Sequence, residues 1–183
     1  ALGLSRPHMP YKGLIMAILI SPMIVPLIIT AAGMFFFYAR INLVYSFTGI
    51  ILAHVALATP FVVITVTATL VGFDMNMVKA AQSLGARPVR TFFKVIMPLI
   101  LPGVISGALF AFITSFDEVV IVMFMGSLDQ LTIPKQMWAG IRQEISPVIL
   151  CMATCLVILS ILLLTTVELL RRRSEKLRGI KSR

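Results

Sequence analysis

An acidic pair, Asp117 and Glu118, is the strongest candidate for chemistry in this sequence, because it interrupts a long apolar stretch. Ionisable side chains near membrane depth are costly, and they usually face a protein interior or a water-filled path. The pair therefore predicts a pathway or gate that favours cations. The alternative is that the pair marks the periplasmic interface of the membrane, about 27 Å along a helix from Leu99. Neighbouring residues on a helix point about 100° apart, so we expect only one of the two to face a pathway.

The other reactive side chains favour packing over chemistry. His54 stands among apolar residues, which is more typical of a buried side chain bonded to a neighbouring helix than of a proton relay. Cys151 and Cys155, four residues apart in an apolar run, are typical of plain buried thiols. The sequence contains no phosphate-binding loop, His-Glu-x-x-His, Cys-x-x-Cys or nucleophile elbow. We therefore expect no catalytic site, no metal site and no ATP bound by this chain.

Membrane spans are the elements that must position these residues. The chain has 183 residues, of which 59% are hydrophobic and 13% are charged. Soluble domains are about half apolar and a quarter charged, so a water-soluble globular protein and a disordered chain are both excluded. About 20 apolar residues cross a bilayer. We predict an all-α integral membrane protein, a single domain over 1–183, with transmembrane helices at about 14–38, 44–71, 96–116 and 148–170.

Several local features refine these spans. Pro22 and Pro26 fall inside the first span, where neighbouring helices can satisfy the carbonyls that they free. The apolar run 119–125 is too short to cross alone, so it either extends the preceding helix or lies against the bundle. Ser146 and Pro147 predict the N-cap and first residue of the last span.

Small residues recur every four positions in the third span, which places them on one face of a helix. Small residues at this spacing let two helices approach closely in lipid, so they predict a helix-packing face. The four residues are Gly103, Gly107, Ala111 and Ser115.

The basic residues gather on one side of the predicted spans. The start of the chain, the loop 72–95 and the tail 171–183 hold 13 of the 16 Lys and Arg residues, and the net charge is +9. Basic loops stay in the cytoplasm, so we predict that both termini and the loop 72–95 are cytoplasmic. The tail suits anionic lipid headgroups as well as orientation, and the pattern favours a membrane over a nucleic acid as the partner.

The loop 72–95 is the most informative segment. Asp74 predicts an N-cap, a short helix follows from Met75 to Leu84, and Gly85 predicts a left-handed helix stop. Pro88 is a suitable start for a second short helix. Ala80 and Ala81 make the first helix thin on one side, and Met77, Val78 and Leu84 are apolar. This surface suits insertion into a groove on a partner as well as a linker lying on the membrane.

A known motif has the same spacing as this loop. Lys79-Ala80-Ala81, three residues, Gly85, nine residues and then Val95-Ile96-Met97-Pro98 resembles the EAA motif of the inner-membrane permeases of ABC importers. Three positions depart from that motif, because Lys79 stands for its Glu, Val95 for its Ile and Met97 for its Leu. The lysine reverses a charge, whereas the other two replacements stay apolar.

The resemblance extends over the whole chain. Leu99-Ile100-Leu101-Pro102-Gly103, Ser115-Phe116-Asp117-Glu118 and Leu131-Thr132-Ile133-Pro134 are similar to the spermidine and putrescine branch. Such permeases usually have six spans, so the resemblance implies four helices of the C-terminal part of that fold and two N-terminal spans missing ahead of Ala1.

The resemblance also implies partners and a coupling site. It implies an inner-membrane location, a second permease subunit, two cytoplasmic ATPase subunits that bind the ATP, and a periplasmic solute-binding protein. The helix in the loop 72–95 would dock in a groove of the ATPase as the coupling helix. The residues implied in this coupling are Asp74, Lys79, Ala80, Ala81, Leu84, Gly85 and Ala86.

Three alternatives stay open at this point. The first is an ABC permease for another small solute. The second is a stand-alone channel or secondary transporter, which the loop spacing and the lack of a second intramembrane charge cluster disfavour. The third is a membrane anchor, which would need no proline-bearing spans.

Overall fold

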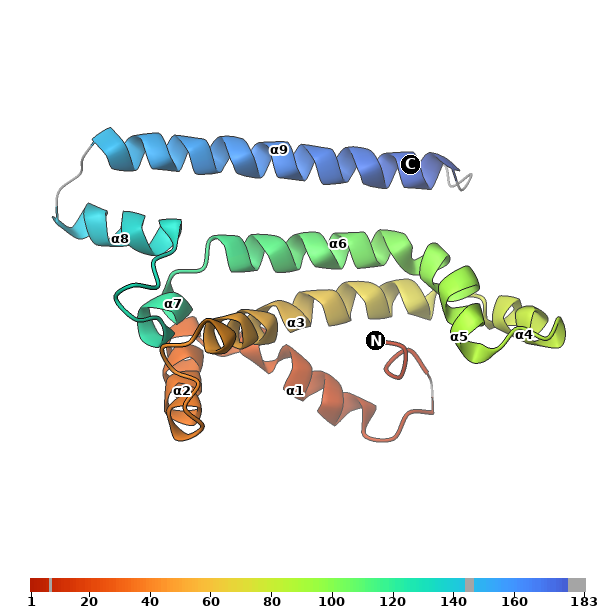
Figure 1. The fold of residues 1–183 in the computed structure, drawn as a ribbon. Coiled ribbons are helices and arrows are strands. Elements are labelled where there is room, and N and C mark those ends of the chain that lie inside the picture. Colours follow the sequence, from red (N-terminus) through yellow and green to blue (C-terminus); the bar gives the residue numbers. More distant parts are fainter. Residues whose placement is uncertain (7, 144–146, 178–183) are drawn as a thin grey trace.

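The computed structural model describes residues 1–6, 8–143 and 147–177, and all regular elements in these residues are helices (Figure 1). The all-α prediction is therefore confirmed. In chain order the helices are α1 (Lys12–Ile24), α2 (Leu27–Arg40), α3 (Phe47–Val71), α4 (Met75–Ser83), α5 (Pro88–Thr91), the π-helical turn η1 (Phe92–Ile96), α6 (Met97–Phe116), α7 (Val120–Met125), α8 (Ile133–Gln143) and α9 (Pro147–Leu177).

Three stretches are long and apolar enough to cross a membrane. They are 47–71 in α3, 88–116 in α5 to α6, and 147–166 in α9. Figure 1 shows α3, α6 and α9 running side by side, with α4 and α5 at one end and α2, α7 and α8 at the other. We call these the loop end and the outer end. Pro147 begins α9 as predicted, whereas its expected N-cap, Ser146, lies outside the described residues.

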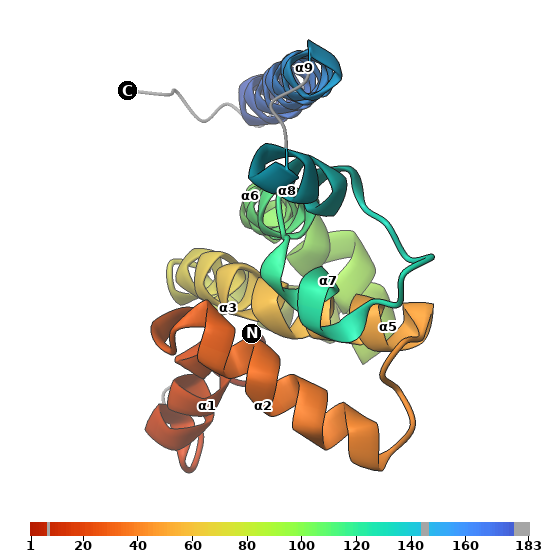
Figure 2. The same cartoon turned by 90° about the vertical axis from the view of Figure 1, so that its left-hand side faces the viewer.

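The first predicted span is two helices instead of one. α1 and α2 are bent by 109° at Val25 and Pro26. Pro22 is accommodated inside α1, where the Ser21 hydroxyl donates a 2.8 Å hydrogen bond to the Ile18 carbonyl that the proline leaves without its usual donor. Pro26 then forces the residue before it into an extended conformation, with ψ of Val25 at 136°, and the helix ends. Beyond the bend, α2 lies across the outer end of the bundle (Figure 2).

The packing face predicted on α6 meets α3. Gly103 and Gly107 are buried, and a Cβ on Gly107 would lie only 2.5 Å from Thr65 Oγ1 and 3.1 Å from Val62 Cα. A Cβ on Gly103 would collide with the side chain of Thr69. Only glycine permits this approach of the two backbones, so α3 and α6 form a tightly packed pair.

Two apolar clusters hold the remaining elements on this pair. At the outer end, Ala31 of α2, Ala53 and Leu57 of α3, and Ile121 and Met125 of α7 are buried together. The segment around α7 therefore lies against the bundle, which was one of its two predicted positions.

The second cluster lies at the loop end and joins Val66 and Leu70 of α3 to Ile100 of α6. The expected burial of Cys151 and Cys155 is wrong for this chain, because both lie exposed on α9. α9 packs along α6 and α8 by one side only, which leaves the rest of its surface uncovered.

Candidate functional site

The loop 72–95 has the local geometry that its sequence predicts. Asp74 caps α4 at its N-terminus, where its Oδ1 accepts a 2.9 Å hydrogen bond from the backbone N–H of Asn76. This bond satisfies one of the backbone donors that the first turn of a helix leaves free. The helix begins at Met75 as expected and ends at Ser83, one residue earlier than expected.

Gly85 stops α4 in the left-handed conformation, with φ at +79°. The N–H of Ala86 donates to the Ala81 carbonyl at 3.0 Å, and the N–H of Gly85 donates to the Gln82 carbonyl at 2.9 Å. These two bonds form a Schellman motif, which satisfies carbonyls at the end of the helix. An added Cβ at Gly85 would meet no atom within 4 Å, so the conformation requires glycine for backbone reasons alone.

Apolar side chains are exposed on the outer surface of this loop. Leu84 is 89% exposed, and Met77 is also exposed. Ala80 and Lys79 are exposed as well, whereas Ala81 and Ala86 are half-buried. A short capped helix with exposed apolar side chains and a thin alanine position can insert into a groove on another protein.

A π-helical turn joins this loop to α6, and the sequence analysis did not predict it. In η1 the N–H of Met97 donates to the carbonyl of Phe92, five residues earlier. Pro98 follows directly, and a proline ring clashes with the carbonyl four residues before it, here that of Lys94. The wider π turn relieves this clash, so the proline that closes the motif accounts for the local widening.

The acidic pair is divided between two environments at the outer end. Glu118 is buried, and its Oε1 accepts a 2.7 Å hydrogen bond from the N–H of Ile121 at the start of α7. Asp117 is exposed, and its carboxylate has no hydrogen-bond partner among the described residues. The two neighbours therefore lie in different surroundings, and which of them faces a pathway stays a prediction.

Each carboxylate lines its own cavity. Asp117 contributes to a cavity of about 390 Å³ between α6, α8 and α9, together with Trp138 and Ser160. Glu118 contributes to a cavity of about 380 Å³ at the bend between α1 and α2, together with Phe61 and Thr114. A carboxylate beside an aromatic ring is a favourable setting for a cationic amine.

His54 joins the two central helices near the outer end. Its Nδ1 lies 2.7 Å from the hydroxyl of Ser115, the last of the four small residues on the α6 face. His54 is half-buried, and its Nε2 is buried without a partner among the described residues. The prediction of a packing residue bonded to a neighbouring helix is confirmed.

Gln130 is a structural residue of the outer end that the sequence analysis did not identify. Its side-chain amide donates to the Tyr45 carbonyl at 3.3 Å and accepts from the N–H of Ser127 at 3.0 Å. The N–H of Tyr45 donates to the Met125 carbonyl at 2.9 Å, and Tyr45 has a φ of 58°. These bonds hold Tyr45 in the left-handed conformation, which non-glycine residues seldom adopt.

The motif Leu131-Thr132-Ile133-Pro134 shapes the start of α8. The Thr132 Oγ1 accepts from the N–H of Lys135 at 3.3 Å, and the Thr132 carbonyl accepts from the N–H of Gln136 at 2.9 Å. Pro134 follows the first helical residue, where its missing N–H costs nothing. Across the described ranges, no three His, Cys, Asp or Glu side chains gather into a group that could hold a metal ion.

Comparison with known proteins gives a consistent assignment. Residues 2–176 match the family described as binding-protein-dependent transport system inner membrane component. The chain is 30% identical over 175 residues to the spermidine/putrescine transport system permease protein PotC of Haemophilus influenzae, which covers 96% of this chain and 68% of that protein.

Two Escherichia coli K12 proteins are similar at the same level. The spermidine/putrescine permease protein PotC is 29% identical over 176 residues, covering 96% of this chain and 67% of that protein. The putrescine transport system permease protein PotI is 30% identical over 140 residues, covering 73% of this chain and 50% of that protein.

Proposed function

This chain belongs to the family of binding-protein-dependent transport system inner membrane components, and we propose that it is the permease subunit of an ATP-driven importer for polyamines such as spermidine and putrescine. It is a multi-pass membrane protein of a transport family and not an enzyme. Its similarity to PotC and PotI over most of its length supports the solute class. The stand-alone channel and the plain anchor fit this family less well.

The observation that carries the proposal is the geometry of the loop 72–95. Its helix α4 is capped at both ends, by Asp74 and by the Schellman motif at Gly85, and so keeps its shape while presenting Leu84 to the outside. In the proposal, α4 docks into a groove of a separate cytoplasmic ATPase that binds the ATP. Closure of the ATPase then moves α4, and the movement reaches α6 through α5 and η1.

The proposed orientation places the loop end in the cytoplasm. Figure 1 shows α4 and the far end of α9, which leads into the basic tail, at the same end of the bundle. The three remaining basic residues, Arg40, Lys135 and Arg142, belong to α2 and α8 at the other end. The 13-to-3 distribution of Lys and Arg supports this orientation through the positive-inside rule.

The proposed pathway residue is Asp117. A polyamine carries several positive charges at neutral pH, and its passage is costly unless fixed negative charges offset them. Asp117 offers a carboxylate that has no partner among the described residues, in a cavity that Trp138 also lines, whereas Glu118 is engaged with the backbone of α7. Asp117 therefore meets the cation that a periplasmic binding protein releases, and Glu118 keeps α7 in place.

Site-directed cross-linking tests the proposed ATPase contact. Leu84 and Leu128 are 89% and 92% exposed at opposite ends of the bundle, so they form a matched pair. Each is replaced by cysteine in a background with Cys151→Ser and Cys155→Ser, and a bifunctional thiol reagent is added to the complex with its ATPase. We expect Leu84→Cys to cross-link to the ATPase and Leu128→Cys to remain unlinked. Cross-linking of Leu128→Cys alone would reverse the orientation and contradict the proposal.

A further inference from the structure

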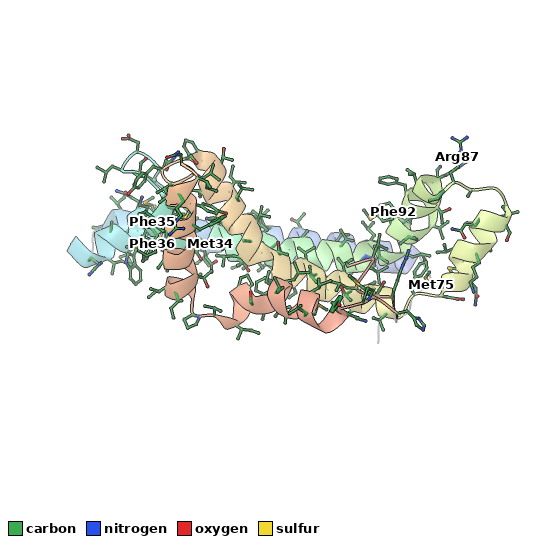
Figure 3. The ribbon with its side chains drawn as sticks, turned by 90° about the horizontal axis from the view of Figure 1, so that it is seen from below. Met34, Phe35, Phe36, Met75, Arg87 and Phe92 are labelled. Carbon is green, nitrogen blue, oxygen red and sulfur yellow. The ribbon has the colours of Figure 1, made fainter. Side chains whose placement is uncertain are left out.

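A cavity of about 720 Å³ lies inside the elbow between α4 and α5, and it is larger than either cavity at the outer end. Its walls come from the last turn of α3, the inner side of α4, the α5–η1 segment and residues 1–6. Leu70, Val78 and Phe92 belong to its mostly apolar lining. Figure 3 places Met75 and Phe92 on the two arms of this elbow and Arg87 at its outer tip.

The cavity lies where the apolar spans meet the polar loop. The apolar stretch of α3 ends at Val71, and the next apolar stretch begins at Pro88, so both stretches border the cavity. A lining of this kind has few partners for water, because a buried water needs several polar groups around it. A hydrocarbon chain suits these walls, and the bilayer supplies such chains at this depth.

The charge at the cavity indicates which kind of lipid headgroup would bind there. Arg6 is part of the lining, which includes no carboxylate, and Arg6 forms no ion pair with any described residue. The loop 72–95 adds four basic residues against the single acidic Asp74. An unpaired guanidinium beside an apolar cavity favours a ligand with an apolar tail and an anionic head, since Arg binds phosphate oxygens in a bidentate manner.

We propose that this cavity binds one anionic phospholipid, with an acyl chain among Leu70, Val78 and Phe92 and the phosphate on Arg6. The bound lipid supports the inner side of α4 and leaves its outer side open. The proposal concerns a second ligand, distinct from the transported solute. It requires only that the loop end lies at a membrane surface, so it can hold or fail independently of the solute and of the ATPase contact.

Native mass spectrometry of the full chain tests this proposal. The chain, in detergent, is titrated with phosphatidylglycerol or with phosphatidylcholine of the same acyl chains. We expect one phosphatidylglycerol to be retained in preference to phosphatidylcholine. Arg6→Gln should weaken its retention about fivefold, the size expected for one basic residue near a headgroup. Arg142→Gln, a matched control on α8 at the outer end, should leave retention unchanged.

A second measurement locates the lipid and covers the case of a poorly folded variant. Phosphatidylglycerol with a photoreactive acyl chain is cross-linked to the wild-type chain in vesicles, and the labelled peptides are identified. We expect label in residues 70–96, and we expect Val78→Trp, which places a bulkier side chain in the cavity lining, to reduce it.

Three results would overturn the proposal: equal retention of the two lipids, label only on α9 or the tail, or unchanged label in Val78→Trp. The last result would mean that the lipid labels residues 70–96 from outside the cavity.

Discussion

The two ends of the α3–α6 pair are held in shape by different kinds of contact. At the loop end, the bonds that define α4 join residues within five positions of each other, such as Ala86 to Ala81. At the outer end, the decisive bonds join residues far apart in the chain, such as His54 to Ser115 and Gln130 to Tyr45. The loop 72–95 leaves Met77 and Leu84 exposed, whereas the outer end buries Glu118 and Gln130.

This difference suits two different tasks. A segment whose shape depends only on its own backbone can move as a unit without losing that shape, which a lever between two proteins requires. A site that must hold a carboxylate at a fixed place needs several elements to converge, because buried polar groups must be fully bonded. The close approach of α3 and α6 at Gly103 and Gly107 connects the two ends.

The largest loss of stability is expected from a change in the contact between α3 and α6, on which both ends depend. Gly107→Leu puts a side chain where Thr65 and Val62 leave no room for even a Cβ, and such overpacking costs about 1–3 kcal/mol or more. We expect the thermal unfolding temperature and the amount of chain in the membrane to fall sharply. Ala108→Leu, at an exposed position one residue along, is the matched control. Equal behaviour of the two variants would show that the pair is not tightly packed.

The next effect separates the two acidic residues at the outer end. Asp117→Asn should reduce uptake of labelled spermidine at least about tenfold, because a unit charge about 4 Å from a cation contributes up to about 4 kcal/mol near a protein surface. Glu118→Gln keeps an oxygen that can accept from Ile121 and should transport near the wild-type rate. Uptake is normalised to permease in the membrane. A loss confined to Glu118→Gln would assign the pathway to the other cavity.

The smallest effect is expected from the outer-end hydrogen bonds alone. Gln130→Met keeps the size of the side chain but removes its bonds to Tyr45 and Ser127, each of which contributes about 0.5–1.5 kcal/mol. We expect a modestly lower unfolding temperature with uptake largely retained. Gln136→Met, at an exposed position of α8, should leave the temperature unchanged. No difference between these variants would mean that the outer end does not depend on this distant contact.

The loop end could be predicted from the sequence because its signals are local. Asp74, Gly85 and Pro88 each act through the backbone within one helical turn, and all three do what their residue types favour. The role of the glycines of α6 could also be predicted, since their spacing alone identifies the face that packs on another helix. The π turn was missed because Pro98 permits several local solutions, and only the arrangement of α5 and α6 selects one.

The outer end could be predicted only in part, because its contacts join residues that are far apart in the sequence. The residue types alone identified Asp117 and Glu118 as candidates. That one is exposed and the other buried depends on α7, which packs on Ala31 and Ala53. The same packing holds α2 across the end of the bundle. The chain therefore bends by 109° at Pro26, where the sequence alone would also allow a mild kink. Nothing within one helical turn of Tyr45 indicates Gln130, which lies 85 residues away.

The central claim is that the backbone conformation at Gly85 allows the loop 72–95 to couple movement of the ATPase to solute uptake. A side chain at a φ of +79° costs about 1 kcal/mol or more, least for asparagine and most for a β-branched residue, while no neighbouring atom opposes either replacement. The most direct test is ATP-driven uptake of labelled spermidine by vesicles that contain the complete transporter with Gly85→Val or Gly85→Asn. We predict that both variants insert normally, that Gly85→Asn transports, and that Gly85→Val loses uptake together with stimulated ATP hydrolysis. Wild-type uptake by Gly85→Val would contradict the claim.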